Sequence, residues 1–187
     1  MTIFEPNKVY SANQLNKLGF TSNHLTMLIS QNELIRLQRG YYVVNIDIDQ
    51  FLAIIQLYPE AIVCLHSALY HYDYLDALPN IHTIAVSKAN NRYKYKHNQI
   101  RLKAYFRDDK YINLGVKTSN YKGVDFQIYD KERTIIDCIR RKKLLSANTY
   151  KQAIQKYIND PDKNIDRLRN YAKILRIKDK VDILIEP

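Results

Sequence analysis

The feature that most constrains the fold is a pair of helix starts separated by a glycine, in VYSANQLNKLGFTSNHLTML, residues 9–28. Ser11 is a good N-cap, and Gln14 can complete a capping box with it. Gly19 supplies the left-handed residue that most easily ends a short helix. Thr21 can then cap a second helix. The segment therefore predicts two short helices joined by a tight turn.

Two helices joined in this way are typical of a helix-turn-helix, whose second helix enters the major groove of DNA. Leu25, Leu28 and Ile29 recur at helical spacing and should face the core. The opposite face then carries residues that can contact bases or phosphates, and the predicted contacts are Thr21, Ser22, Asn23, Thr26 and Met27. A helical hairpin that serves only packing is the alternative.

The next segment, NELIRLQRGYYVVN, predicts a β-hairpin with Gly40 at the turn. A hairpin after a helix-turn-helix makes a winged helix, and Arg36, Arg39 and Tyr41 would contact phosphate or the minor groove. A solvated strand edge is the alternative. A winged helix normally has a further helix in front, and the apolar residues 49–58 are a candidate replacement for it.

The rest of the chain alternates between strand and helix patterns, so we predict an α+β fold, with a winged helix-turn-helix at residues 1–58 and a mixed α/β domain at residues 59–187. Residues 61–64 predict a short strand or turn. The predicted strands are 82–88, 100–106 and 124–130. The predicted helices are 66–74, 131–145 with Asp130 as N-cap, 147–158, 165–175 and a short one near the end.

The chain is strongly basic, and the surplus charge lies in its middle. The formal net charge is +10 over 187 residues, which favours polyanionic partners. Residues 88–124 carry ten Lys and Arg against two Asp and Glu, a net charge of +8, whereas residues 1–60 total −1. Nucleic acid is therefore the first partner to consider.

Tyrosines are interspersed among the central cations, as in RYKYK. If this run is a strand, Arg92, Lys94 and Lys96 share one face and the tyrosines the other. We predict that these cations, with Arg101 and Lys103, contact the DNA backbone. The alternatives are a solvated face that keeps the protein soluble and a surface that docks an acidic partner protein.

No apolar run approaches the roughly 18 residues needed to span a bilayer, and the start MTIFEPNK has no signal-peptide layout, so we expect a cytoplasmic protein without membrane contact. Cys64 and Cys138 lie among apolar residues and should be buried and reduced.

An enzyme needs a complete catalytic constellation, which the sequence does not offer. A metal-dependent nuclease is the catalytic alternative, and its acidic material would be Asp108, Asp109, Asp125, Asp130 and Glu132. No known spacing links these residues. His66 and His71 lie five positions apart, so they would not share a helix face as zinc ligands. We expect no catalytic residues, no metal and no cofactor.

Three motifs follow one another along the chain: RLQRGYY, then LHSALYHYDYL followed by IHTIAVSK, then IYDKERTIIDCI. Together they resemble the AbiEi family, the antitoxins of bicistronic abortive-infection toxin–antitoxin systems. The matching positions are Arg39, Gly40, Tyr42, Ser67, Ala68, Leu69, Glu132, Arg133, Thr134 and Asp137. The match spans residues 11 to about 140 and leaves the last forty-odd residues unmatched.

The resemblance implies a repressor that binds inverted repeats in its own promoter, and a C-terminal domain that neutralises a nucleotidyltransferase-like toxin. The departure from the family is the absent first helix of the winged helix. Arg133, Asp137 and Arg141 are spaced i, i+4, i+8 on one helix face, which favours a structural role for the late motif. The alternative function is a DNA-binding regulator without a toxin partner.

Overall fold

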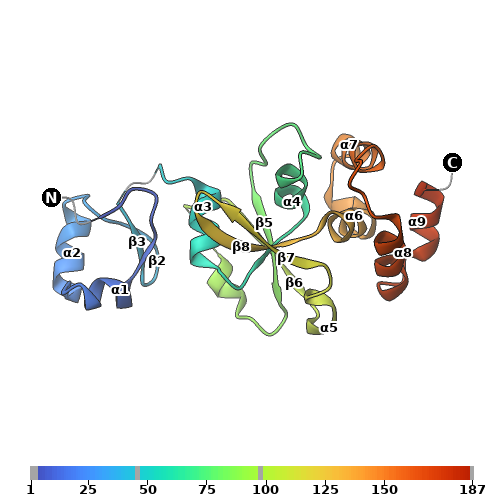
Figure 1. Cartoon of the computed structure of the whole chain (residues 1–187). Coiled ribbons are helices and arrows are strands. Elements are labelled where there is room, and N and C mark those ends of the chain that lie inside the picture. Colours follow the sequence, from blue (N-terminus) through green and yellow to red (C-terminus); the bar gives the residue numbers. More distant parts are fainter. Residues whose placement is uncertain (1–3, 45–46, 97–98, 186–187) are drawn as a thin grey trace.

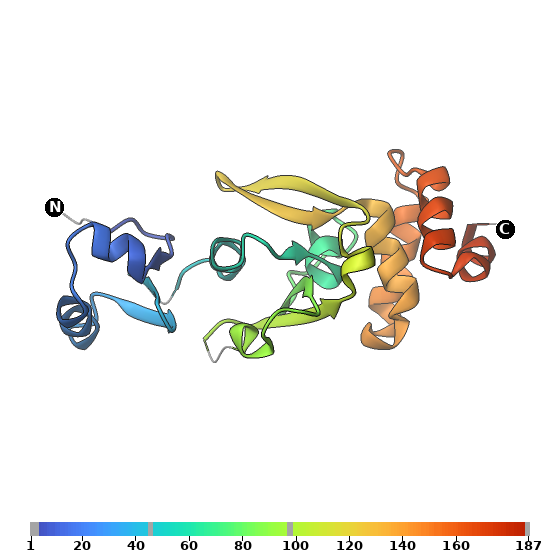
Figure 2. The same cartoon turned by 90° about the horizontal axis from the view of Figure 1, so that it is seen from below.

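The computed structural model describes residues 4–44, 47–96 and 99–185, and has a mixed α+β fold with two β-sheets. The molecule is elongated, with a small sheet at the N-terminal end, the larger sheet in the middle and a group of helices at the C-terminal end (Figures 1 and 2). Its strands are β1 (Tyr10–Ser11), β2 (Ile35–Gln38), β3 (Tyr41–Val43), β4 (Ile62–Val63), β5 (His82–Ser87), β6 (Leu102–Arg107), β7 (Val116–Tyr121) and β8 (Val124–Tyr129). Its helices are α1 (Ala12–Lys17), α2 (Ser22–Ser30), α3 (Gln50–Leu57), α4 (Leu65–His71), η1 (Arg92–Tyr95), α5 (Asp109–Ile112), α6 (Lys131–Arg140), η2 (Lys142–Leu144), α7 (Ala147–Ile158), α8 (Ile165–Ile174) and α9 (Lys178–Ile185).

The N-terminal helices begin at the predicted caps. The Ser11 hydroxyl accepts a hydrogen bond from Gln14 N, and the Gln14 side chain bonds back to Ser11 N, so the capping box is present. Thr21 Oγ1 accepts a hydrogen bond from His24 N. Gly19 has a φ of +90° in the turn between the helices. The sequence therefore predicted both helices correctly.

The N-terminal sheet has the order β1-β3-β2, so α1 and α2 connect one edge strand to the other. Tyr42 on the central strand shares a hydrophobic cluster with Leu15 of α1 and Leu25 of α2. The Phe4 ring lies 5.5 Å from the Tyr10 ring and 5.4 Å from the Phe20 ring. Within described residues 4–10 there is no helix, and Phe4 covers this side of the core instead.

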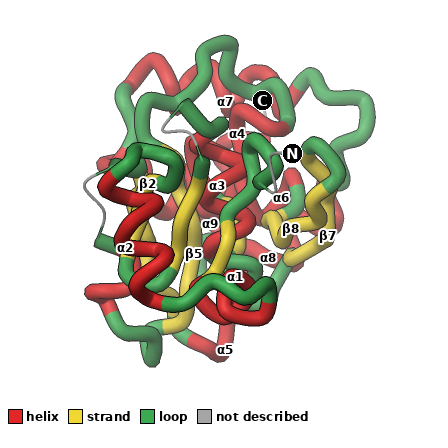
Figure 3. The backbone as a smooth tube through the Cα atoms, turned by 90° about the vertical axis from the view of Figure 1, so that its left-hand side faces the viewer, coloured by secondary structure: helices red, strands yellow, loops and turns green. Residues whose placement is uncertain are grey.

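Helix α3 lies between the two sheets. Its Ile54 and Leu57 share a hydrophobic cluster with Leu37 and Val43 of the N-terminal hairpin, and the same cluster contains Ile84 of the larger sheet. Viewed from the N-terminal end, α1 and α2 are nearest the viewer in Figure 3. The predicted replacement helix at residues 49–58 thus exists, but it packs on both sheets. The division at residue 58 stays a prediction.

The larger sheet has the order β6-β5-β4-β8-β7. β4 pairs with β5 in antiparallel and with β8 in parallel orientation, while β5 and β6 are parallel and β7 and β8 form an antiparallel hairpin. The sequence did not predict β7, whose residues VKTSNY alternate between half-buried and exposed. The predicted strands at residues 82–88, 100–106 and 124–130 are confirmed with bounds within two residues.

Helices α6 to α9 close the C-terminal end of the molecule. Asp130 Oδ1 accepts a hydrogen bond from Arg133 N, so it is the predicted N-cap of α6. The predicted helix 131–145 is interrupted after Arg140, because Arg141 leaves helical geometry with φ −118° and ψ 28°, and η2 follows. The cysteines Cys64 and Cys138 are free and buried in the core of this part.

Charged residues of the late motif form a buried network that holds α6 to the sheet. Asp137 Oδ2 lies 2.7 Å from Arg107 Nη2 at the end of β6, and Asp137 Oδ1 lies 3.5 Å from Arg133 Nε. The Arg133 guanidinium also donates to the carbonyl oxygens of Tyr111 and Leu114. All three charged side chains of this network are at most 5% exposed. A structural role for Arg133 and Asp137 agrees with this geometry, and the sequence missed Arg107.

Candidate nucleic-acid interface

The structure brings the hairpin and the basic centre together in one groove of about 550 Å³. Its lining comes from the β2–β3 hairpin and from the segment around η1, which are separated by more than fifty residues in the chain. The lining residues are Arg36, Leu37, Gln38, Arg39, Tyr41, Tyr93, Lys94, Lys96 and Gln99, and we call this the hairpin–η1 groove. Five of the residues predicted to bind DNA therefore lie on one concave surface.

The hairpin places two arginines at this groove. Arg36 is paired in register with Tyr42, and the pairing becomes irregular between Arg36 and Gln38. Gly40 turns the chain with a φ of +80°. Both Arg36 and Arg39 are exposed, and within the described part of the chain no ion pair involves either guanidinium. The hairpin thus offers two cations that solvent or a ligand can reach.

The other side of the groove is the run for which the sequence analysis considered a strand, and the structure has a 3-10 helix there instead. Residues 92–95 form the 3-10 helix η1, which begins where Asn91 Oδ1 accepts a hydrogen bond from Tyr93 N. Tyr58 donates its hydroxyl hydrogen to the Lys94 carbonyl oxygen at 2.8 Å, and so fixes η1 to the end of α3. The tyrosines do not share a face, because Tyr95 is 5% exposed and Tyr93 is 76% exposed. Tyr93 is consequently an aromatic side chain of the groove that the sequence did not predict.

The cations of η1 and Lys96, which follows η1 directly, differ in how far they are neutralised. Lys94 forms an ion pair with Glu60. Burial alone lowers the pKa of the Lys94 ammonium, but the hydrogen bond to Glu60 and the charge of that carboxylate, with smaller contributions from Tyr95 and Tyr41, together raise the pKa above its usual value. Lys96 Nζ lies 4.9 Å from the centroid of the Tyr93 ring, and the Arg92 guanidinium lies 4.6 Å from that of Phe106. Lys96 and Arg92 are thus oriented by aromatic rings, while Lys94 is partly neutralised by a carboxylate.

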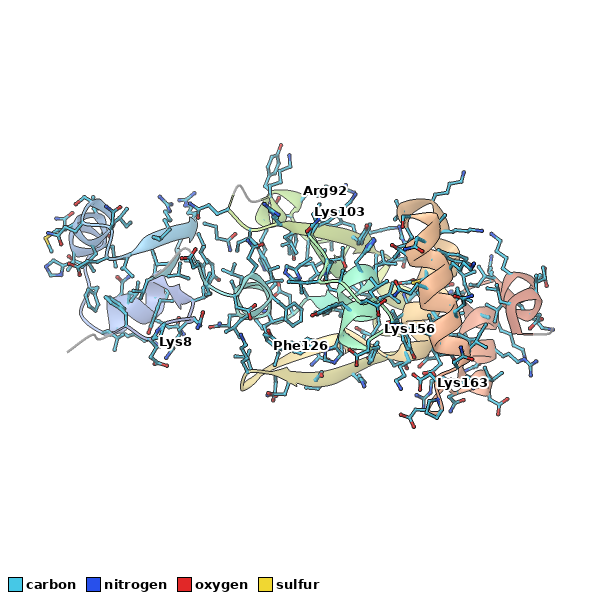
Figure 4. All side chains as sticks on the ribbon, turned by 90° about the horizontal axis from the view of Figure 1, so that it is seen from above. Lys8, Arg92, Lys103, Phe126, Lys156 and Lys163 are labelled. Carbon is cyan, nitrogen blue, oxygen red and sulfur yellow. The ribbon has the colours of Figure 1, made fainter. Side chains whose placement is uncertain are left out.

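The residues predicted on α2 lie outside this groove but are all exposed. Thr21 is occupied as the N-cap, and the Thr26 hydroxyl donates to the Ser22 carbonyl oxygen at 3.0 Å. Asn23 and Met27 are exposed, Met27 by 49%. In Figures 2 and 4, α2, the β2–β3 hairpin and η1 follow one another along one long side of the molecule. A long ligand can therefore contact all three.

Arg101 and Lys103 do not belong to one surface. Lys103, on β6, is exposed and lies near Arg92 in Figure 4. Arg101 instead lines a separate cavity beside α3 and α4. Arg101 therefore lies apart from the hairpin–η1 groove, and its contact with DNA stays a prediction.

Four of the five acidic residues considered for a nuclease have structural roles, and the fifth, Asp109, is the first residue of α5. Asp108 caps α5, Asp130 caps α6, and Asp125 accepts a hydrogen bond from Asn120. Buried Glu132 accepts a hydrogen bond from Asn164 N. Across residues 4–44, 47–96 and 99–185, no group of three or more His, Cys, Asp and Glu is placed to hold a metal ion.

None of the helices in the described residues combines the length and apolar character that crossing a membrane requires. No family model matches the sequence, and no curated protein matches it either.

Proposed function

We propose that this protein binds double-stranded DNA as a transcriptional repressor of its own operon, and that it is the antitoxin of an AbiEi-type toxin–antitoxin system. The observation that carries the proposal is the hairpin–η1 groove, where Arg36, Arg39, Lys94 and Lys96 converge from two segments. Lys and Arg side chains gathered on one face are the electrostatic footprint of a phosphate backbone.

The N-terminal elements support a winged-helix mode of binding. On this proposal α2 is the recognition helix and β2–β3 is the wing, and the order of two helices followed by a hairpin supports this mode. Asn23 would then reach a base edge, since an amide can bond adenine bidentately, and the wing arginines would contact the backbone or the minor groove. On this proposal Phe4 and α3 substitute for a first helix, since Phe4 packs on the hydrophobic cluster around Tyr42 and α3 packs on the cluster that contains Leu37 and Val43.

The antitoxin assignment rests on the resemblance of the three motifs. Most of their residues have scaffold roles here. Ser67 and Thr83 exchange two hydrogen bonds between α4 and β5, and Arg133 and Asp137 hold α6. On this proposal the protein acts in the cytoplasm, binds inverted repeats in its own promoter and neutralises a nucleotidyltransferase-like toxin. Motifs that build a scaffold are compatible with a family that keeps its fold while its binding surfaces vary.

A mobility-shift titration of the upstream promoter region against a shuffled duplex of equal length tests DNA binding. We expect a sequence-preferring shift at moderate salt, and its absence would refute the repressor. A matched pair of variants locates the surface, with Asn23→Ala lowering sequence preference and Arg39→Ala lowering affinity for both duplexes.

Co-expression tests the antitoxin. The product of the neighbouring gene should arrest growth when expressed alone, and co-expression of this protein should restore growth. If a nucleotidyltransferase-like neighbour is absent, or growth is not restored, the protein is a DNA-binding regulator without a toxin partner.

A further inference from the structure

A second cavity, of about 870 Å³, lies apart from the hairpin–η1 groove. Its walls come from the start of α3, the second half of α4, the segment that leads into β5 and the β7–β8 turn. Its volume lies within the range of small-molecule sites in proteins. Neither DNA binding nor the late motif accounts for it.

One wall of this cavity is aromatic. The Phe51 ring lies 5.1 Å from the Tyr121 ring in an edge-on contact and 5.6 Å from the His82 imidazole. Phe126, labelled in Figure 4, packs edge-on against Phe51 from the sheet side. His82 is 6% exposed, and among the described residues its Nδ1 has no hydrogen-bond partner. This wall therefore presents aromatic rings together with the buried imidazole of His82, whose Nδ1 makes no hydrogen bond to the described residues.

The opposite rim carries exposed apolar side chains. Tyr70 on α4 is 39% exposed and Leu78 in the following loop is 61% exposed, and both line the cavity. Large apolar side chains at the mouth of a cavity can cover a flat ligand that lies against the aromatic wall. This geometry favours a planar ring as the occupant.

The charges around the cavity disfavour an anionic occupant. Asp47, Asp49 and Asp73 line it, against Arg101 and Lys122, so the lining has a net charge of −1. Lys122 Nζ lies 2.7 Å from Asp49 Oδ2, so these two charges neutralise each other and the lining keeps its net charge of −1 through Asp47 and Asp73 against Arg101.

The histidines of the cavity do not change this balance. Burial lowers the pKa of both His71 and His82 below the usual value, which favours the neutral form of each ring. Carboxylates repel phosphate but accept hydrogen bonds from hydroxyl groups.

We propose that this cavity binds an unphosphorylated nucleoside. The base would pack on the aromatic wall formed by Phe51, Tyr121 and His82, and the sugar hydroxyls would donate hydrogen bonds to the carboxylates at the rim. Base–aromatic stacking is tolerant of base identity, so the wall fixes the class of ligand rather than one base.

Equilibrium dialysis of the full chain against radiolabelled adenosine, guanosine, cytidine and uridine tests the proposal without DNA, so the result does not depend on the proposed function. At least one nucleoside should bind saturably at one site per chain, with a dissociation constant on the order of 0.1 mM. Its 5′-monophosphate should bind more weakly. No saturable binding of any of the four, or tighter binding of the monophosphate, would overturn the proposal.

Two variants place the site. Phe51→Leu removes the ring but keeps apolar volume, and Tyr70→Ser removes an exposed wall, so each should weaken binding about tenfold. Ile183→Ser, which removes a side chain that is 78% exposed on α9, is the matched control and should leave binding unchanged. A urea titration verifies that each variant folds. Wild-type binding by folded Tyr70→Ser, or equal losses in all three variants, would contradict the assignment.

Discussion

The ion pair between Lys94 and Glu60 leads to a prediction that separates two neighbouring cations of the hairpin–η1 groove. Lys96 has no carboxylate partner within the described residues, whereas Lys94 does. Each phosphate contact made by a Lys or Arg contributes about −0.9 to the slope of log K against log salt concentration. Lys96→Ala should therefore reduce the slope by about 0.9. Lys94→Ala should reduce it by clearly less, because Glu60 already neutralises that ammonium.

Two further changes follow from the same geometry. Glu60→Gln removes the carboxylate and frees Lys94, so the slope should steepen and affinity at low salt should rise. Changing both hairpin arginines to Ala should reduce the slope by about 1.8, since two contacts are lost.

Fluorescence anisotropy with a labelled promoter duplex, over about 50 to 300 mM KCl, measures these slopes. Lys173→Ala is the control, because Lys173 is exposed on α8, away from the groove. Equal effects of Lys94→Ala and Lys96→Ala would refute the argument from the ion pair. An effect of Lys173→Ala as large as that of Lys96→Ala would refute the groove as the DNA surface.

Other predictions concern stability and reactivity. Asp137→Ala leaves the buried Arg107 guanidinium without its carboxylate partner, so it should lower the free energy of unfolding in urea by about 3 to 5 kcal/mol. Lys88→Ala removes an exposed ion pair and should lower it by less than about 1 kcal/mol. Similar losses in the two variants would contradict this reading. Gly115→Ala should lower the thermal midpoint, because Gly115 has a φ of +77° and an added Cβ would lie 2.6 Å from Arg133 Cβ; an unchanged midpoint would count against that packing. Burial raises the pKa of both cysteine thiols, so a thiol reagent at pH 8 should modify them only after unfolding, and rapid reaction of the native protein would show that they are accessible.

Local signals predicted most of the helices because a cap depends on residues within one turn. Ser11, Thr21 and Asp130 each accept a hydrogen bond from an amide three residues on, which a sequence can reveal. The hairpin at Gly40 was predicted for a similar reason, since its turn requires a positive φ.

The failures involved contacts between distant segments or weak strand patterns. Alternating tyrosines and lysines around Lys94 are a pattern typical of a strand, but this run is a 3-10 helix. The Tyr58 hydroxyl, 36 residues earlier, donates a hydrogen bond to the Lys94 carbonyl oxygen, and the Tyr95 side chain is buried. The edge strand β7 is polar, so its composition gave no strand signal. Its usable signal was Lys122-Gly123, where both residues have a positive φ as a tight hairpin turn requires.

Charge counted along the sequence differs from charge counted over the folded surface. Residues 1–60 total −1, which alone would make a weak DNA-binding unit. In the fold, Arg36 and Arg39 from this segment face Lys94 and Lys96 from the basic centre, and Glu60 is paired with Lys94 at the same place. Glu60, which belongs to residues 1–60, thereby neutralises part of the positive charge that residues 88–124 contribute to this groove. If the groove is the DNA surface, mutations at Glu60 should strengthen DNA binding, whereas mutations of the cations should weaken it. If the groove is only a solvated basic face, neither kind of mutation should change the affinity for DNA.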